Sequence, residues 1–316
     1  MAERKIIAVL GATGAQGGGL VRAIQADTGS GFRARAVTRN PDSDKAKALA
    51  ALGAEVVQGD VSDPASLTRA FQGAHGAYCV TFFWDHFSPE RETGEARQMA
   101  LAAKAAGVAH VVWSTLEDVR TFVPLSNPSI PTLNGKYKVP HFDGKGEADA
   151  FFREAGVPTT FYYASFYWDN FIYFGAGPKP GPDGQLQLVL PMGNGKLAGV
   201  AAEDIGRTAY GIFKRGKELT GKKVGVAGEI LTGAEIAEKM SRALKRPVRY
   251  QPVPFETYRK FGFPGAEDLG NMFQFYHDFE NEVNGLRDPA FARHLNPALQ
   301  TFDQWLAANA AKIPLE

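Results

Sequence analysis

A glycine-rich turn directly after a short apolar run constrains this chain most. The apolar residues 6–10 lead into Gly11-Ala12-Thr13-Gly14-Ala15-Gln16-Gly17, and helix-compatible residues begin at Leu20. A buried strand that enters such a turn and then a helix brings backbone N–H groups and the positive end of the helix dipole to one point. Glycines there let a ligand approach the backbone and let the helix pack closely on the sheet. The turn therefore predicts a pyrophosphate site formed by Gly11, Thr13, Gly14, Ala15, Gln16 and Gly17.

The first 115 residues alternate between strand and helix patterns. Strands are predicted at 6–10, 32–38, 55–60, 76–81 and 110–115, with helices at 45–52 and 90–106 and a further helix that starts at Asp63. Asp63 and Pro64 are typical N-cap and first-turn residues. Strand–helix units at this spacing favour a Rossmann-like, doubly wound parallel sheet with helices on both faces. Ligands bind such sheets at the carboxyl ends of the strands, so the residues that follow each strand are the candidates for a site.

The pattern changes in the second half of the chain. After a sixth strand at 159–164, a turn-dense segment leads to expected strands at 186–190, 224–227 and 248–253 and helices at 202–214, 232–244 and 254–262. We expect residues 1–158 to form the dinucleotide-binding domain, whose sheet the strand at 159–164 also joins. Residues 165–316 are then a smaller C-terminal α+β lobe that covers the cleft for cofactor and substrate. The proline-rich segment 117–140 is predicted to be an irregular loop or lid, followed by a helix at 141–154.

The composition excludes several classes of function. Lysine and arginine number 35 against 34 acidic residues, so no strong field attracts nucleic acid or an anionic membrane. No apolar run approaches the ~18 residues of a membrane-spanning helix, and no leader pattern precedes the first strand. The single Cys79 lies in an apolar stretch and is expected to be a buried, unreactive residue of a cytoplasmic protein. There is no H-E-x-x-H motif and no clustered Cys or His, so no metal site is predicted.

Arg39 indicates which dinucleotide binds. Proteins that select NAD place a carboxylate near the end of the second strand, whereas an arginine there can pair with the 2′-phosphate of NADP. The strand here ends in Val37-Thr38-Arg39-Asn40, which favours NADP(H). Two alternatives stay open: Lys45 or Lys47 holds the phosphate, or Arg39 is a solvated turn residue. Asp60 can either accept from the adenine amino group or cap the following helix.

The candidate catalytic residues depart from the usual reductase pattern. Short-chain reductases use Tyr-x-x-x-Lys on a helix, where the lysine lowers the pKa of the phenol, together with a serine after the fifth strand. Ser114 and Lys145 stand in the serine and lysine positions, but His141 occupies the position of the tyrosine. Three possibilities stay open: His141 acts as general acid, Tyr137 reaches in from the loop, or the site binds a dinucleotide without a proton donor.

With these residues in view, the chain resembles the NmrA-like family, an atypical branch of the short-chain dehydrogenase/reductase superfamily that includes NADPH sensors. The resemblance runs nearly end to end and rests on residues 11–18, 37–41, 53–60, 141–147, 262–266, 269–273 and 299–306. It implies that Arg39 contacts the 2′-phosphate and Lys145 the nicotinamide ribose. Further expected cofactor contacts are the residues that follow the third, fourth and sixth strands: Asp60, Val61, Thr81, Phe82, Phe83, Trp84, Ser165, Phe166, Tyr167 and Trp168.

The resemblance also implies two functions. Family members that lack the tyrosine act as redox sensors that bind a regulatory protein according to the NADP(H) level, while other members reduce quinones. With His141 in the tyrosine position, the sequence favours an NADP(H)-binding sensor with weak or no catalysis. The alternative is an NADPH-dependent quinone or carbonyl oxidoreductase. The expected partners are accordingly a regulatory protein, a small quinone or carbonyl substrate, or a second copy of the chain in a homodimer.

Overall fold

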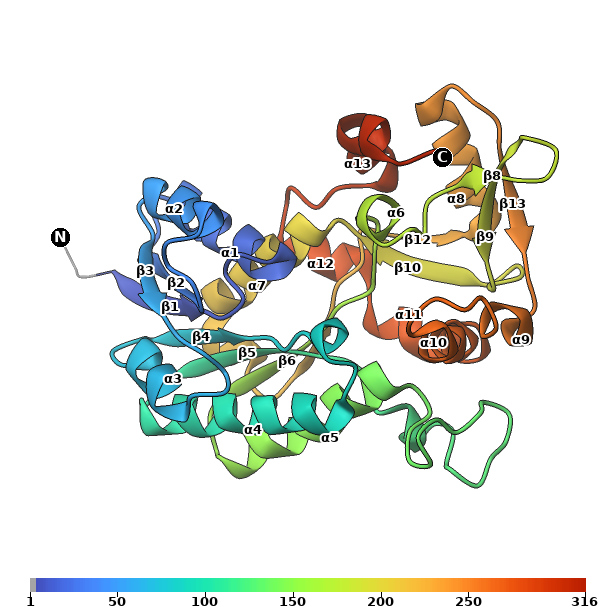
Figure 1. The fold of residues 1–316 in the computed structure, drawn as a ribbon. Coiled ribbons are helices and arrows are strands. Elements are labelled where there is room, and N and C mark those ends of the chain that lie inside the picture. Colours follow the sequence, from blue (N-terminus) through green and yellow to red (C-terminus); the bar gives the residue numbers. More distant parts are fainter. Residues whose placement is uncertain (1–3) are drawn as a thin grey trace.

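A seven-stranded parallel sheet forms the centre of the first half of the molecule (Figure 1). The computed structural model describes residues 4–316. The strand order is β11-β6-β5-β4-β1-β2-β3. From β1 the chain adds β2 and β3 on one side and then β4, β5 and β6 on the other, so the order of the strands reverses between β1 and β4. Sheets of this kind bind ligands outside the carboxyl ends of the strands at such a reversal. The predicted doubly wound sheet is confirmed, with strands β1 (Lys5–Val9), β2 (Phe32–Thr38), β3 (Glu55–Gln58), β4 (Gly76–Cys79), β5 (His110–Thr115), β6 (Thr159–Tyr163) and β11 (Lys223–Gly225).

Helices cover both faces of this sheet (Figure 1). On one face lie α1 (Ala15–Ala26), α2 (Asp44–Ala51), α7 (Ala202–Arg215) and α12 (Pro289–Leu295); on the other lie α3 (Pro64–Phe71), α4 (Pro89–Ala105) and α5 (Pro140–Glu154). The helices α1 and α7 touch through glycines, because a Cβ on Gly19 would come within 2.6 Å of the Glu203 carbonyl oxygen. Gly19 thus brings α1 against a helix of the second half, where the sequence suggested only packing on the sheet.

The local signal for the start of α3 is confirmed, and two further helices start with capping boxes. Asp63 caps α3 by accepting from the backbone N–H groups of Ala65 and Ser66, and Pro64 occupies the first turn. Thr232 and Thr301 form capping boxes that begin α8 (Gly233–Leu244) and α13 (Phe302–Asn309). These signals are readable because each involves residues only three or four positions apart.

Two small sheets and several helices build the rest of the second half. The strands β7 (Phe166–Tyr167), β10 (Lys196–Val200) and β12 (Glu229–Thr232) form one sheet, and β8 (Lys179–Pro180), β9 (Leu186–Leu190) and β13 (Val248–Pro252) form the other. The remaining helices are α6 (Asn170–Tyr173), α9 (Phe255–Tyr258), α10 (Ala266–Asp278) and α11 (Glu280–Leu286). The helix expected at 254–262 is only the single turn α9. Trp168, Phe171, Phe302 and Trp305 pack together in a core of this half.

The chain returns to the large sheet after residue 165. Strand β11, expected in the smaller lobe, instead pairs in parallel with β6, placing Val224 beside Tyr162. Helix α7 also packs on α1. The division at about residue 158 stays a prediction, and these two elements cross it. Within residues 4–316 no helix has the length and apolar character needed to cross a membrane. The expectation that no leader precedes the first strand also concerns residues 1–3, which lie outside the described part of the chain.

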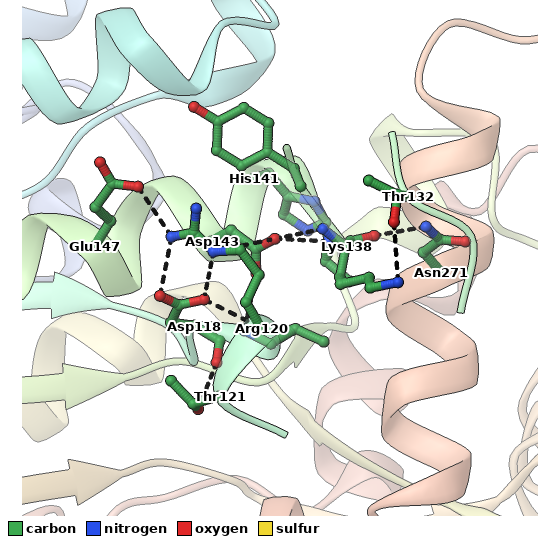
Figure 2. A network of polar contacts seen from close by, with 12 residues as sticks. Asp118, Arg120, Thr121, Thr132, Lys138, His141, Asp143, Glu147 and Asn271 are labelled. Atoms are coloured by element: carbon green, nitrogen blue, oxygen red, sulfur yellow. Dashed lines mark hydrogen bonds and ion pairs between the residues drawn. The ribbon is translucent and has the colours of Figure 1, made fainter. Parts of the chain in front are cut away.

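Segment 117–140 has little regular structure, as expected, but polar contacts hold it in place (Figure 2). It contains η2 (Val119–Thr121), and its Arg120 pairs with Asp118 at 2.8 Å and with Glu147 of α5 at 2.9 Å. The carboxylate of Asp143 accepts from the backbone N–H groups of Val119, Lys138 and Val139. Burial raises the pKa of Asp143 to about 6 despite these hydrogen bonds. The segment is therefore tied to the start of α5.

A buried lysine and helix α10 hold the far part of the same segment. The Lys138 side chain is fully buried, and its Nζ donates to the carbonyl oxygens of Asn127 and Ile130 and to Thr132 Oγ1. Asn271 of α10 donates to the carbonyl oxygen of Lys138 at 2.5 Å (Figure 2). The segment thus joins α5 to α10.

Candidate functional site

The glycine turn lies after β1 at the reversal of the sheet. Gly11 has a positive φ of 60°, and the N–H of Gly14 donates to its carbonyl oxygen at 2.9 Å. A Cβ on Gly17 would lie 2.4 Å from that same oxygen, so the turn and the helix meet only because residue 17 is glycine. No side chain caps α1 at Gly14, and its first turn holds no acidic residue. The start of α1 therefore fits an anionic group such as a pyrophosphate.

Gln16 connects this turn to the neighbouring strands. Its Oε1 accepts from Ser114 Oγ at 2.9 Å and from the Tyr78 hydroxyl, and its Nε2 donates to the Tyr167 hydroxyl. Burial raises the pKa of Tyr78, and it raises the pKa of Tyr167 to about 12. Ser114 is thus engaged with a glutamine of the turn. The sequence identified Gln16 as a cofactor residue but gave no signal for this role of its side chain.

Lys145 lies at the carboxyl end of β4, on the face of α5 that meets α4. Its Nζ contacts Thr81 Oγ1 at 2.5 Å and Glu92 Oε1 at 2.9 Å. Glu92 of α4 is fully buried, and the Thr81 hydroxyl also donates to its Oε1 at 2.5 Å. The Lys145 ammonium is 5.5 Å from the centre of the Trp113 ring. The structure thus brings two predicted residues, Thr81 and Lys145, together around a glutamate that was not predicted.

His141 is engaged and covered. Its Nδ1 is 2.7 Å from Asp268 Oδ1 of α10, and its backbone N–H donates to the other carboxylate oxygen of Asp268 at 3.2 Å. The imidazole lies against Trp84, with ring centres 4.8 Å apart, and only 7% of the side chain is exposed. Because a carboxylate only accepts hydrogen bonds, Nδ1 carries the proton of this pair. The histidine therefore joins α5 to α10 at the edge of the candidate site.

Tyr137 does not reach Lys145 in this structure. Its hydroxyl donates to Glu90 Oε1 of α4 at 2.7 Å. Burial, and then the hydrogen bond to Glu90, raise the pKa of the Tyr137 phenol. Both effects oppose a role as proton donor near neutral pH.

Arg39 and Asp60 follow β2 and β3 as expected. Arg39 is exposed, and its guanidinium is 4.0 Å from Asp85 of η1 (Phe83–Asp85), the segment after β4. Lys45 and Lys47 are also exposed, and the choice among the three cations stays a prediction. Asp60 accepts from the backbone N–H and hydroxyl of Ser62, which lowers its pKa. The alternative that Asp60 caps the next helix is wrong, because Asp63 is the cap.

The aromatic candidates divide into exposed and core residues. Phe82 is exposed, whereas Phe83 is buried next to Trp84. Trp168 is buried against Phe302 and Trp305 and packs in the core of the second half. The other candidates that follow the strands are partly or fully buried: Val61, Ser165, Phe166 and Tyr167. Ser165 Oγ is buried and finds no hydrogen-bond partner among residues 4–316.

Cys79 is an interior residue of the large sheet. Cys79 is fully buried in β4, as expected, and burial raises the pKa of its thiol. Across the described chain, from residue 4 onward, no three His, Cys, Asp or Glu side chains gather as metal ligands would.

Two functional candidates escaped the sequence analysis for different reasons. Glu92 lies on the same buried face of α4 as Ala96, Met99 and Ala103. A carboxylate at an apolar position of a helix could therefore have been recognised from the sequence as a candidate. Asp268 meets His141 across 127 positions of sequence, and no local pattern indicates such a contact.

Comparison with known proteins places this geometry in a family. A model of the NmrA-like family matches residues 3–312. An NmrA-like family domain-containing oxidoreductase of Aspergillus flavus is 29% identical over 87% of this chain and 84% of its own length. The nitrogen metabolite repression protein of Neurospora crassa is 31% identical over 80% of this chain and 55% of its own. The crystal structure of a negative transcriptional regulator in complex with NADP superimposes with a TM-score of 0.79, at 25% identity, over 98% of this chain and 96% of that one.

Proposed function

The chain belongs to the NmrA-like family, and on this premise we propose that it is an NADP(H)-binding redox sensor that signals to a protein partner and has little catalytic activity of its own. One observation carries the proposal. Lys145 is retained at the end of β4, but His141, one turn before it, is held by Asp268 and covered by Trp84. The short-chain reductase pattern places a tyrosine beside that lysine as the proton donor, and His141 stands there instead.

The residues around the turn fit the dinucleotide. Gly11, Gly14 and Gly17 present the uncapped start of α1 to the pyrophosphate, and Arg39 would pair with the 2′-phosphate. Lys145 would hold the nicotinamide ribose, with Trp84 and Tyr167 near the ring. When bound, NADPH supplies a hydride; the chain's own groups bind and orient it. A cytoplasmic location agrees with the single cysteine.

The relatives support both parts of this proposal. One is a negative transcriptional regulator that was crystallised with NADP, and in another crystal with NAD. This relative was crystallised with both cofactors. The preference of the present chain for NADP(H) over NAD(H), which we assign to the end of β2, is therefore the property to measure.

Replacing Arg39 tests the cofactor assignment. Loss of a charge-assisted hydrogen bond to the 2′-phosphate should weaken NADPH binding by about tenfold while NADH binding changes by less than about twofold. Fluorescence titration of Arg39→Ala with both cofactors gives the ratio. Lys45→Ala is the matched control, since Lys45 is also an exposed cation, on α2. If the preference for NADPH persists in Arg39→Ala and is lost in Lys45→Ala, the phosphate contact belongs to α2.

An NADPH-dependent oxidoreductase is the second candidate, favoured by relatives named as oxidoreductases. Absorbance of NADPH with a panel of quinones and enals separates the two. As a sensor, the protein should consume NADPH at no more than about one-thousandth of a typical reductase rate of ~10 per second. Rapid turnover that His141→Phe abolishes, while binding of NADPH is retained, would establish the enzyme instead.

A further inference from the structure

Glu92 is a buried carboxylate with no evident structural purpose. It is fully buried in α4, and among residues 4–316 its Oε2 has no hydrogen-bond partner. A buried ion pair with an unsatisfied oxygen does not stabilise a fold better than apolar side chains of the same size. The cost of this pair therefore indicates a role outside packing.

The hydrogen bonds define what Glu92 does to Lys145. The Thr81 hydroxyl has one proton and donates it to Glu92 Oε1, so it can only accept from Lys145. The ammonium donates to Thr81 Oγ1 and forms an ion pair with Glu92 Oε1, 2.9 Å away. Its third contact, to the Thr81 carbonyl oxygen at 3.4 Å, is long. An N–H of the ammonium can therefore donate to a ligand while the hydrogen bond to Thr81 Oγ1 and the ion pair with Glu92 stay in place.

We propose that Glu92 is a positioning residue that holds the Lys145 ammonium at the carboxyl end of β4, so that it can donate to the ribose on the nicotinamide side of NADP(H). This proposal rests on the proposed cofactor site. It assigns Glu92 no contact with the cofactor. Glu92 acts through Lys145, and Thr81 is the bridge between them.

Two ligands separate this role from general damage to the fold. NADPH carries both halves of the dinucleotide, whereas 2′,5′-ADP carries only the adenosine half with its 2′-phosphate and lacks the nicotinamide ribose. Glu92→Gln keeps the size of the side chain and removes its charge. We expect this variant to bind NADPH about tenfold more weakly and 2′,5′-ADP as the wild type does. An equal loss for both ligands would mean structural damage and would overturn the proposal.

A double-variant cycle tests whether Glu92 acts through Lys145. In a Lys145→Met background, Glu92→Gln should cause no further loss of NADPH affinity, because the positioned group is gone. Additive losses would overturn the proposal. Glu95→Gln is the matched control in the same helix, since Glu95 pairs with Arg91 at 2.9 Å and does not contact Lys145. It should bind both ligands normally.

Three further outcomes are decisive. If Glu92→Gln does not fold, Glu92→Leu with Lys145→Met removes both charges together. Its NADPH affinity should equal that of Lys145→Met alone, and a weaker value contradicts the proposal. If the wild type binds both ligands and Glu92→Gln binds NADPH unchanged, only the positioning role fails. If the wild type binds neither ligand, the cofactor site itself is wrong and the positioning role falls with it.

Discussion

Single buried side chains decide how this protein responds to pH, and His110 is the clearest case. It lies at the start of β5 with only 4% of its surface exposed, and its Nε2 is 2.8 Å from Thr160 Oγ1. Burial lowers its pKa to about 4, and His75 adds a smaller effect in the same direction. The folded state therefore keeps His110 neutral in a range where the unfolded chain takes up a proton.

This difference predicts a pH-dependent part of the stability. The contribution is fully present above the unfolded pKa of about 6.5 and is lost as the pH falls toward 4. Asp143 and Asp149, whose pKa values burial raises to about 6, act in the opposite sense over part of this window. Comparing a variant with the wild type at each pH cancels their effect.

We expect the wild type to lose stability relative to His110→Gln as the pH falls. Glutamine can keep a hydrogen bond to Thr160 but does not titrate. Between pH 7 and pH 5 the free energy of unfolding of the wild type should fall by about 2 kcal/mol relative to the variant. Urea unfolding at both pH values measures this. For His294→Gln, at an exposed position, the free energy of unfolding should change with pH as it does for the wild type. If His110→Gln also shows the pH response of the wild type, the assignment to His110 is contradicted.

At the scale of elements, the sequence predicted what is local. Six strands of the large sheet and the starts of α3 and α8 were predicted from periodicity and from residues within a few positions of each other. The segment 117–140 was recognised as irregular from its prolines. Its attachment was not predictable, because Lys138 finds its acceptors within the loop while Asn271 reaches it from α10, 133 positions away.

The candidate site shows the same limit. Residues placed by the end of a strand, such as Arg39, Thr81 and Ser114, could be named in advance because parallel strands end at one edge. The partners that define their chemistry come from helices. Glu92 reaches Lys145 from α4, and Asp268 reaches His141 from α10. The sequence therefore indicated which residues are candidates. It did not indicate their hydrogen-bond and ion-pair partners, because these come from segments distant in the sequence.

On the scale of the whole molecule, the two halves are joined by a buried ion pair. Arg287, at the end of α11, is fully buried and contacts both carboxylate oxygens of Glu117, just after β5. Its Nε donates to the carbonyl oxygen of Ala164, after β6. One guanidinium therefore ties two strand ends of the large sheet to the C-terminal helices. Ala164 and Glu117 lie close in sequence to Ser165 and Ser114, two of the candidate site residues.

We expect the loss of Arg287 to destabilise the whole chain, because Glu117 would stay buried without a partner. Arg287→Met should lower the free energy of unfolding by about 3–5 kcal/mol, measured by urea denaturation. Replacing both residues, with Glu117→Leu and Arg287→Met, removes the isolated charge and should recover most of that loss. Arg215→Met, which breaks an exposed pair with Glu218, should cost less than about 1 kcal/mol. A double variant as unstable as Arg287→Met would show that the hydrogen bond to Ala164, and not the charge on Glu117, holds the halves together.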